Sequence, residues 1–180
     1  MSNTNEWITL NESEQAIAKF IGKSRYQSAR TAGVKDQRLD SSGEMLDLNG
    51  FGAELAFCRL FNLYPDLAIG VRSGSSDAVT HKGTTVDVKT TRYQNGHILA
   101  TLKKKVEDSD MYVMMIGDFP KYKFAGYIDA KDLLKKDNIK DLGHGKGYAV
   151  KISDLTKIPN STLNNIKRLY WRLWFMSQKG

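Results

Sequence analysis

Residues 75–89 read SSDAVTHKGTTVDVK, a pattern typical of two short strands joined by a tight turn. A three-residue loop that ends at Gly83 would place this glycine where the backbone needs a positive φ. In the register that this loop sets, Asp77 lies directly opposite Asp87, with the two Cβ atoms about 5 Å apart. A two-residue turn at 82–83 would instead put the two acids on opposite faces of the hairpin.

The second strand of this hairpin sets Lys89 beside Asp87. Side chains two residues apart share one face of a strand, so Lys89 joins Asp87 while Val86 and Val88 point into a core. Like charges directly opposite each other destabilise a strand pair, and two carboxylates supply the oxygen ligands that Mg²⁺ prefers. The hairpin therefore predicts a metal site with a lysine beside it. The alternative is a solvated hairpin whose acids face water and pair with the lysine.

A third acid lies in the apolar stretch 49–61, which predicts a buried helix capped by Asn49 or Asp47. Glu54 falls on an apolar face of this helix, where a carboxylate is costly unless it is paired, protonated or bound to a metal. Arg59 is five residues further on and points elsewhere. We interpret Glu54 as a third metal-binding acid; the alternative is a glutamate that snorkels to the surface or caps a neighbouring loop.

The helix-borne acid followed by Asp-x(9)-Asp-x-Lys resembles the PD-(D/E)XK nuclease superfamily over residues 49–91. Ser76 stands where the signature has proline. The resemblance implies a restriction-endonuclease-like αβββαβ core, hydrolysis of phosphodiester bonds with Mg²⁺ (for which Mn²⁺ can substitute), and a 5′-phosphate product. Small proteins of this kind are often encoded by bacteriophages. The resemblance implies catalytic roles for Glu54, Asp77, Asp87 and Lys89, and metal ligation by Glu54, Asp77, Asp87 and the carbonyl of Val88.

Composition favours an intracellular protein with a polyanionic partner. Twenty-seven Lys and Arg against twenty Asp and Glu give a net charge of +7, which favours DNA as a partner, although a merely basic cytosolic protein has the same balance. Cys58 is the single cysteine, so no intrachain disulfide can form and a reducing compartment fits. Residues 1–6 lack the plan of a signal peptide, and no apolar run approaches the roughly 20 residues of a membrane span. We expect a cytoplasmic protein (the host cytoplasm if it is phage-encoded) with no membrane partner.

The remaining pattern predicts one nuclease domain over residues 1–180, with a mixed sheet of the α+β kind and flanking terminal helices. An N-terminal helix and loop would occupy 1–45, the core 46–158 and a C-terminal helix 159–180. Asn11 and Glu14 resemble a capping box that opens the first helix. The other elements expected are strands near 67–71, 98–102, 111–116, 122–128 and 148–152, and a helix near 129–136.

Basic residues close in sequence to the hairpin are candidates for phosphate contacts. Residues 103–105 are three consecutive lysines after a predicted strand, and a plain solvated loop is an equally good interpretation. The nucleic-acid-binding residues that we expect are Arg72, Arg92, Lys103, Lys104 and Lys105.

The C-terminal stretch predicts an aromatic helix. One stripe of this helix would pack against the domain or against a second subunit in a homodimer, and the alternative is stacking on unpaired bases. The stripe consists of Leu163, Ile166, Tyr170, Leu173 and Trp174.

Together these features predict a Mg²⁺-dependent nuclease that acts on DNA, as an endonuclease or a junction resolvase. His81, His97 and His144 are widely spaced and form no zinc-binding pattern. The alternative is a non-catalytic, basic nucleic-acid-binding or assembly protein that keeps the nuclease fold. Dependence of function on a metal ion would separate the two.

Overall fold

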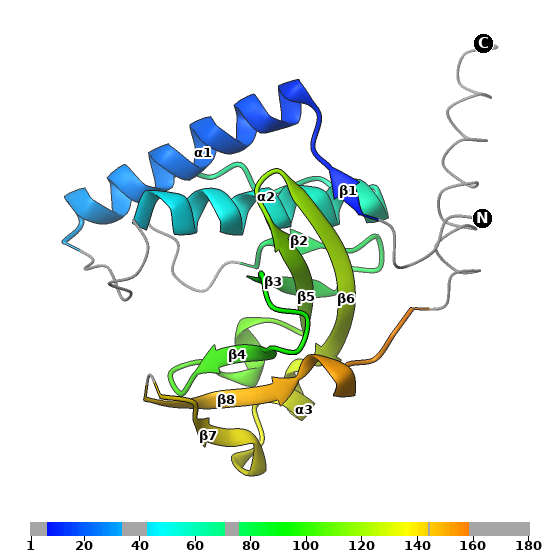
Figure 1. Cartoon of the computed structure of the whole chain (residues 1–180). Coiled ribbons are helices and arrows are strands. Elements are labelled where there is room, and N and C mark those ends of the chain that lie inside the picture. Colours follow the sequence, from blue (N-terminus) through cyan, green and yellow to red (C-terminus); the bar gives the residue numbers. More distant parts are fainter. Residues whose placement is uncertain (1–6, 34–42, 71–75, 144, 159–180) are drawn as a thin grey trace.

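The computed structural model describes residues 7–33, 43–70, 76–143 and 145–158. Two long helices lie on one side of a curled, five-stranded mixed sheet, and a three-stranded sheet lies on its other side (Figure 1). One buried cluster lies between the helices and the larger sheet, and a second lies between the two sheets. The predicted α+β class with a mixed sheet is confirmed.

Helix α1, Glu12–Thr31, begins at the predicted capping box. The Asn11 side chain accepts a 3.0 Å hydrogen bond from the Glu14 amide, and the Glu14 carboxylate accepts a 2.7 Å bond from the Asn11 amide. These two bonds satisfy backbone donors that the first helical turn leaves without a partner. The prediction of this helix and of its start is confirmed.

Helix α2, Gly43–Phe61, packs between α1 and the sheet. It begins well before the predicted cap at residue 47 or 49, so that cap is wrong. Asn49 lies inside the helix, and its side chain accepts a 3.0 Å bond from the Phe119 amide. A Cβ on Gly52 would collide with the Tyr122 hydroxyl, so glycine lets the helix approach the sheet closely. As predicted, the stretch 51–58 is buried throughout.

The larger sheet has the strand order β1-β6-β5-β3-β2. Strands β3 and β5 are parallel and the other neighbouring pairs are antiparallel. Strand β6 is followed by the short helix α3, Ala130–Leu133, which replaces the longer helix predicted at 129–136. The strands are β1 Ile8–Thr9, β2 Ala78–Val79, β3 Thr85–Thr91, β5 Met111–Asp118 and β6 Lys121–Asp129.

The smaller sheet has the order β4-β8-β7 and is antiparallel throughout. Its strands are β4 His97–Thr101, β7 Ile139–Asp141 and β8 Lys146–Lys151. Strand β4 and a 3-10 turn, Val106–Asp108, lie in the connection between the parallel strands β3 and β5. All of residues 92–110 are described and contain no α-helix, whereas the predicted αβββαβ order has its second helix there.

The first strand predicted near 67–71 is wrong for the residues described. Residues 63–70 form no strand, and Leu67 and Ile69 are 37% and 43% exposed. The guanidinium of Arg25 donates hydrogen bonds to the carbonyls of Asp66 and Ala68, at 2.7 and 3.0 Å. A side chain therefore satisfies backbone carbonyls that a strand would offer to a neighbouring strand. Val71 and the predicted C-terminal helix lie outside the described residues.

Candidate active site

The loop of the β2–β3 hairpin has the predicted three-residue form. The Thr80 amide donates to the Thr84 carbonyl at 2.8 Å, and Gly83 has a φ of 84°. Ala78 pairs with Val86 as the predicted register requires. Asp77 itself lies outside the ladder, because β2 begins at Ala78. The two acids are therefore not a directly opposed strand pair.

The Asp77 carboxylate lies at the edge of β3 that β2 leaves uncovered. Its Oδ2 atom accepts a 2.7 Å hydrogen bond from the Val88 amide, while the Asp77 amide donates to the Val86 carbonyl at 2.8 Å. The N–H and C=O groups of one strand residue point to the same neighbouring strand. The Val88 carbonyl therefore faces the same edge as the Asp77 carboxylate. This backbone bond holds Asp77 next to the residue that follows Asp87.

Asp87 is a buried carboxylate between two lysines. Lys89 Nζ lies 2.5 Å from Asp87 Oδ1, and Lys104 Nζ donates a 3.0 Å hydrogen bond to Asp87 Oδ2. Oδ1 is buried and has the Lys89 ammonium as its ion-pair partner. Lys89 thus lies beside Asp87, as the strand period predicts, and Lys104 adds a partner that the period does not predict.

Glu54 is buried on the helix side of the larger sheet. Its carboxylate pairs with Arg25 of α1 at 2.8 Å, and the two side chains are only 7% and 9% exposed. The Arg25 guanidinium also lies 4.6 Å from the centroid of the Phe51 ring. The ion pair with Arg25 therefore explains how the Glu54 carboxylate, which the sequence assigned to metal binding, can be buried without a metal ion. Metal ligation by Glu54 stays a prediction.

Cys58 lies near two of the predicted acids. Burial, followed by the charges of Glu54 and Asp77, raises the pKa of the Cys58 thiol to about 12. The thiol therefore stays protonated at neutral pH. Within the ranges that the structure describes, no three side chains of His, Cys, Asp and Glu converge closely enough to hold a metal ion.

One family includes this chain. The model described as "Family of unknown function (DUF5843)" matches residues 4–136, well over half of the 180 residues. The chain belongs to the DUF5843 family. The match covers the β2–β3 hairpin and Lys104, and it ends before β7 and β8. No curated protein matches the chain.

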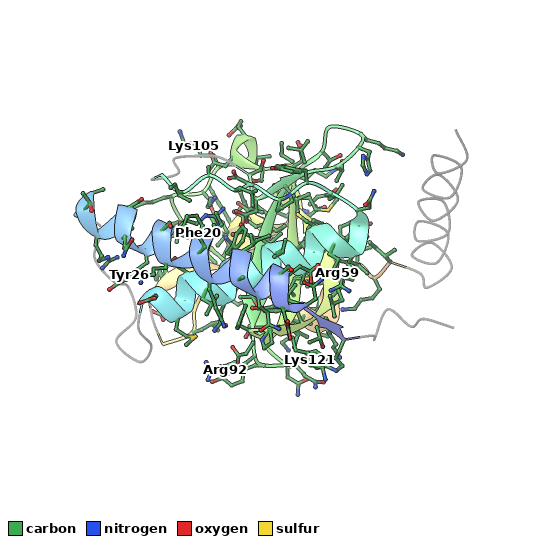
Figure 2. The ribbon with its side chains drawn as sticks, turned by 90° about the horizontal axis from the view of Figure 1, so that it is seen from above. Phe20, Tyr26, Arg59, Arg92, Lys105 and Lys121 are labelled. Carbon is green, nitrogen blue, oxygen red and sulfur yellow. The ribbon has the colours of Figure 1, made fainter. Side chains whose placement is uncertain are left out.

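The other basic candidates of this DUF5843 member are scattered. Arg92 is exposed and lies 3.6 Å from Asp118 through its Nε atom. Figure 2 shows Arg92 and Lys105 on opposite sides of the molecule. Lys103 is exposed, and Arg72 lies outside the described residues. Of the four expected nucleic-acid contacts that the structure describes, Lys104 is therefore the one that lies directly on a predicted catalytic acid.

Two lysines that the sequence did not single out lie close to this site. A pocket of about 320 Å³ is lined by Lys89 and Lys104 together with Lys140 of β7 and Lys146 of β8. The sequence signal that could have found Lys146 is the glycine-rich, basic segment around residue 145. In the described part of the DUF5843 chain, no helix is both long enough and apolar enough to cross a membrane.

Proposed function

We propose that this protein is a Mg²⁺-dependent nuclease that hydrolyses phosphodiester bonds in DNA, as an endonuclease or a junction resolvase. The observation that carries the proposal is the hydrogen bond that holds the Asp77 carboxylate on Val88, the residue between Asp87 and Lys89, at the edge of β3 that β2 leaves uncovered. Asp77 is bonded to the Val88 amide, and Asp87, one residue earlier, lies against Lys89. A restriction-endonuclease-like core is part of the proposal; the hairpin and the helix that carries Glu54 support it, and the helix-free connection between β3 and β5 departs from it.

The oxygen atoms at this edge suit a hard divalent cation. Asp77, Asp87 and the Val88 carbonyl are oxygen donors of the kind that Mg²⁺ and Mn²⁺ prefer. The buried Asp87 Oδ1 faces the Lys89 ammonium at 2.5 Å, so an ion that binds this oxygen would share it with Lys89 or displace it. Asp77, Asp87 and Val88 would hold the ion. When bound, Mg²⁺ supplies positive charge at the scissile phosphate and a more acidic water molecule.

Lys89 would stabilise the charge that develops on the phosphate. Its side chain is 34% exposed, and Asp87 holds the ammonium group at the site. From there it can donate hydrogen bonds to a non-bridging phosphate oxygen or to the attacking water. Attack forms a bond from the water oxygen to phosphorus while the bond to the 3′ oxygen breaks. The proton released by the water returns to the 3′ oxygen through solvent, which leaves a 5′-phosphate and a 3′-hydroxyl.

The second candidate is a non-catalytic nucleic-acid-binding or assembly protein. The ion pairs Arg25–Glu54 and Lys104–Asp87 favour it, because they neutralise two of the predicted acids with cations of the protein itself. Such a protein would bind its partner equally well with Mg²⁺ or with a chelator. Only the nuclease needs the metal for its function.

The test is a cleavage assay on linear, circular, single-stranded and branched DNA, and on RNA, with Mg²⁺, Mn²⁺ or a chelator. We expect the parent protein to cut at least one DNA in either metal and none in the chelator. Asp87→Asn and Lys89→Ala should abolish cleavage, and Lys89→Ala should still bind DNA because Lys89 acts mainly on the transition state. The matched control is Lys131→Ala, an exposed lysine of α3.

Two results would contradict the nuclease proposal. One is the absence of cleavage on every substrate, with the protein shown to be folded. The other is cleavage by Asp87→Asn at the rate of the parent protein, which would assign the activity to a contaminant or to another site.

A further inference from the structure

The pocket beside Asp87 gathers four lysines that come from distant parts of the chain. Lys89 lies on β3, Lys104 follows β4, Lys140 lies on β7 and Lys146 on β8. Leu99 and Tyr148 are among the other residues of its wall, and no acidic side chain of the described residues lines it. The pocket is therefore strongly positive although it borders a carboxylate.

Internal ion pairs compensate little of this charge. Lys89 and Lys104 share the single carboxylate of Asp87. In the part of the chain that the structure describes, Lys140 and Lys146 make no ion pair. Asp141 faces Lys146 across the β7–β8 ladder, but its Oδ1 atom accepts bonds from two amides of the turn, at 2.9 and 3.2 Å. Four lysines around one pocket give it a positive potential, which favours the binding of an anion.

Two glycines, Gly145 and Gly147, lie on the wall of the pocket. Gly147 of β8 pairs with Lys140 of β7 on one side and with Thr101 of β4 on the other. A Cβ at Gly147 would lie 3.0 Å from the Ala100 carbonyl oxygen. Gly145, which has a φ of +93°, adds a second position without a side chain. Neither glycine adds a side chain to the pocket wall.

We propose that this pocket binds a backbone phosphate of a nucleic acid, with Lys140 and Lys146 as its main donors. The inference deepens the proposed function and rests on it for the identity of the partner. Ammonium groups bind phosphate oxygens through charge-assisted hydrogen bonds, and such contacts carry no base sequence information. Lys104 lies on the pocket wall and also contacts Asp87, so the bound phosphate flanks the phosphodiester bond at the candidate active site.

The test measures nucleic-acid binding in the presence of a chelator, where no cleavage is expected. Labelled duplex DNA, single-stranded DNA and RNA are titrated at several salt concentrations and followed by fluorescence anisotropy. The double variant Lys140→Met/Lys146→Met keeps the side-chain stems and removes two charges. For duplex DNA we expect weaker binding and a salt slope, the change in log K with log salt, that is smaller by about 2.

The control is Lys131→Met/Lys151→Met, which removes the same charge from exposed positions outside the pocket. Circular dichroism and thermal melts establish that both double variants are folded. The control should lose less affinity than the pocket variant and keep the slope of the parent. The nucleic acid that shows the largest difference between the two variants is the one that the pocket holds.

Three results would overturn the inference: no binding of any nucleic acid by the parent protein, parental affinity and slope in the pocket variant, or equal losses in the two double variants. The outcome stays separate from that of the nuclease proposal. If binding depends on Lys140 and Lys146 but no Mg²⁺-dependent cleavage occurs, the phosphate-binding proposal is supported and the nuclease proposal is refuted. If the protein cleaves DNA with Mg²⁺ but the pocket variant binds nucleic acid as the parent does, the nuclease proposal is supported and the phosphate-binding proposal is refuted.

Discussion

The carboxylate of Asp77 accepts a 2.7 Å hydrogen bond from the backbone amide of Val88, at the point where β2 no longer covers β3. The bond replaces a ladder hydrogen bond with a side-chain contact. Because its partner is backbone, the position of the Asp77 carboxylate does not depend on the rotamer of another side chain. A short strand β2 thus leaves an edge at which a carboxylate, and not a further strand residue, meets β3.

The first prediction concerns Asp77→Asn. An asparagine retains an oxygen for the Val88 amide but removes a negative charge that, like that of Glu54, acts on Cys58. Without metal we expect the variant to melt at or above the temperature of the parent protein. Saturating Mg²⁺ should raise the Tm of the parent by mass action and that of the variant much less. Equal shifts in thermal melts at matched ionic strength would count against the metal site.

A second prediction follows from the bond between Lys104 and Asp87. A cation that binds Asp87 must compete with the Lys104 ammonium, which is 3.0 Å from Oδ2. Lys104→Met should therefore lower the Mg²⁺ concentration that gives half of the thermal shift, by about tenfold at most, because one charge-assisted bond contributes roughly 1.5 kcal/mol. Lys103→Met, at an exposed neighbour, is the control. A midpoint that stays unchanged or rises would show that Lys104 does not compete with the ion.

The third prediction concerns the buried pair Arg25–Glu54. Arg25→Met should reduce the free energy of unfolding by about 3–5 kcal/mol, because it removes the arginine from a carboxylate that is 7% exposed. Arg25→Met/Glu54→Gln should recover part of that loss, because it removes the buried charge but not the loss of the Arg25 bonds to the carbonyls of Asp66 and Ala68. Arg59→Met is the control, because its pair with Glu14 is more exposed and contributes roughly 0–1 kcal/mol. Urea unfolding that ranks Arg25→Met no lower than Arg59→Met would refute this role.

Alkaline pH should destabilise the protein. Burial, as the largest cause, raises the pKa of Cys58 from 9.0 to about 12 and raises the pKa of Tyr112 and Tyr122 above the ordinary 10.0. These groups bind protons more tightly in the folded state, so their contribution to stability is complete below the unfolded pKa and is lost as pH rises toward the folded pKa. The Tm should fall from about pH 9 upward.

Cys58→Ala tests whether the Cys58 thiol causes the start of this fall in Tm at alkaline pH. It should flatten the Tm profile between pH 9 and 10, below the ordinary pKa of the two tyrosines. Thermal melts from pH 7 to 11 measure both profiles. A parent Tm that is constant across this range, or the same slope in Cys58→Ala, would be inconsistent with thiol titration.

Local patterns in the sequence predicted the features that depend on neighbouring residues. The capping box of Asn11 and Glu14 involves two residues three positions apart. The hairpin depends on a glycine that adopts a positive φ, and the contact of Lys89 with Asp87 depends on the period of one strand. The chemistry of each is complete within a few residues, so no knowledge of the tertiary fold is needed.

Contacts between distant segments were decided by tertiary structure alone. Arg25 reaches Glu54 across 29 residues, and Lys104 reaches Asp87 across 17. Periodicity shows which side chains lie on the same face of a helix or strand. It does not show which other helix or strand will pack against that face. The alternating apolar residues near 67–71 predicted a strand, yet Arg25 bonds to two carbonyls of that segment. The packing of α1 on α2 put Arg25 there, and no local pattern around residue 67 contains that information.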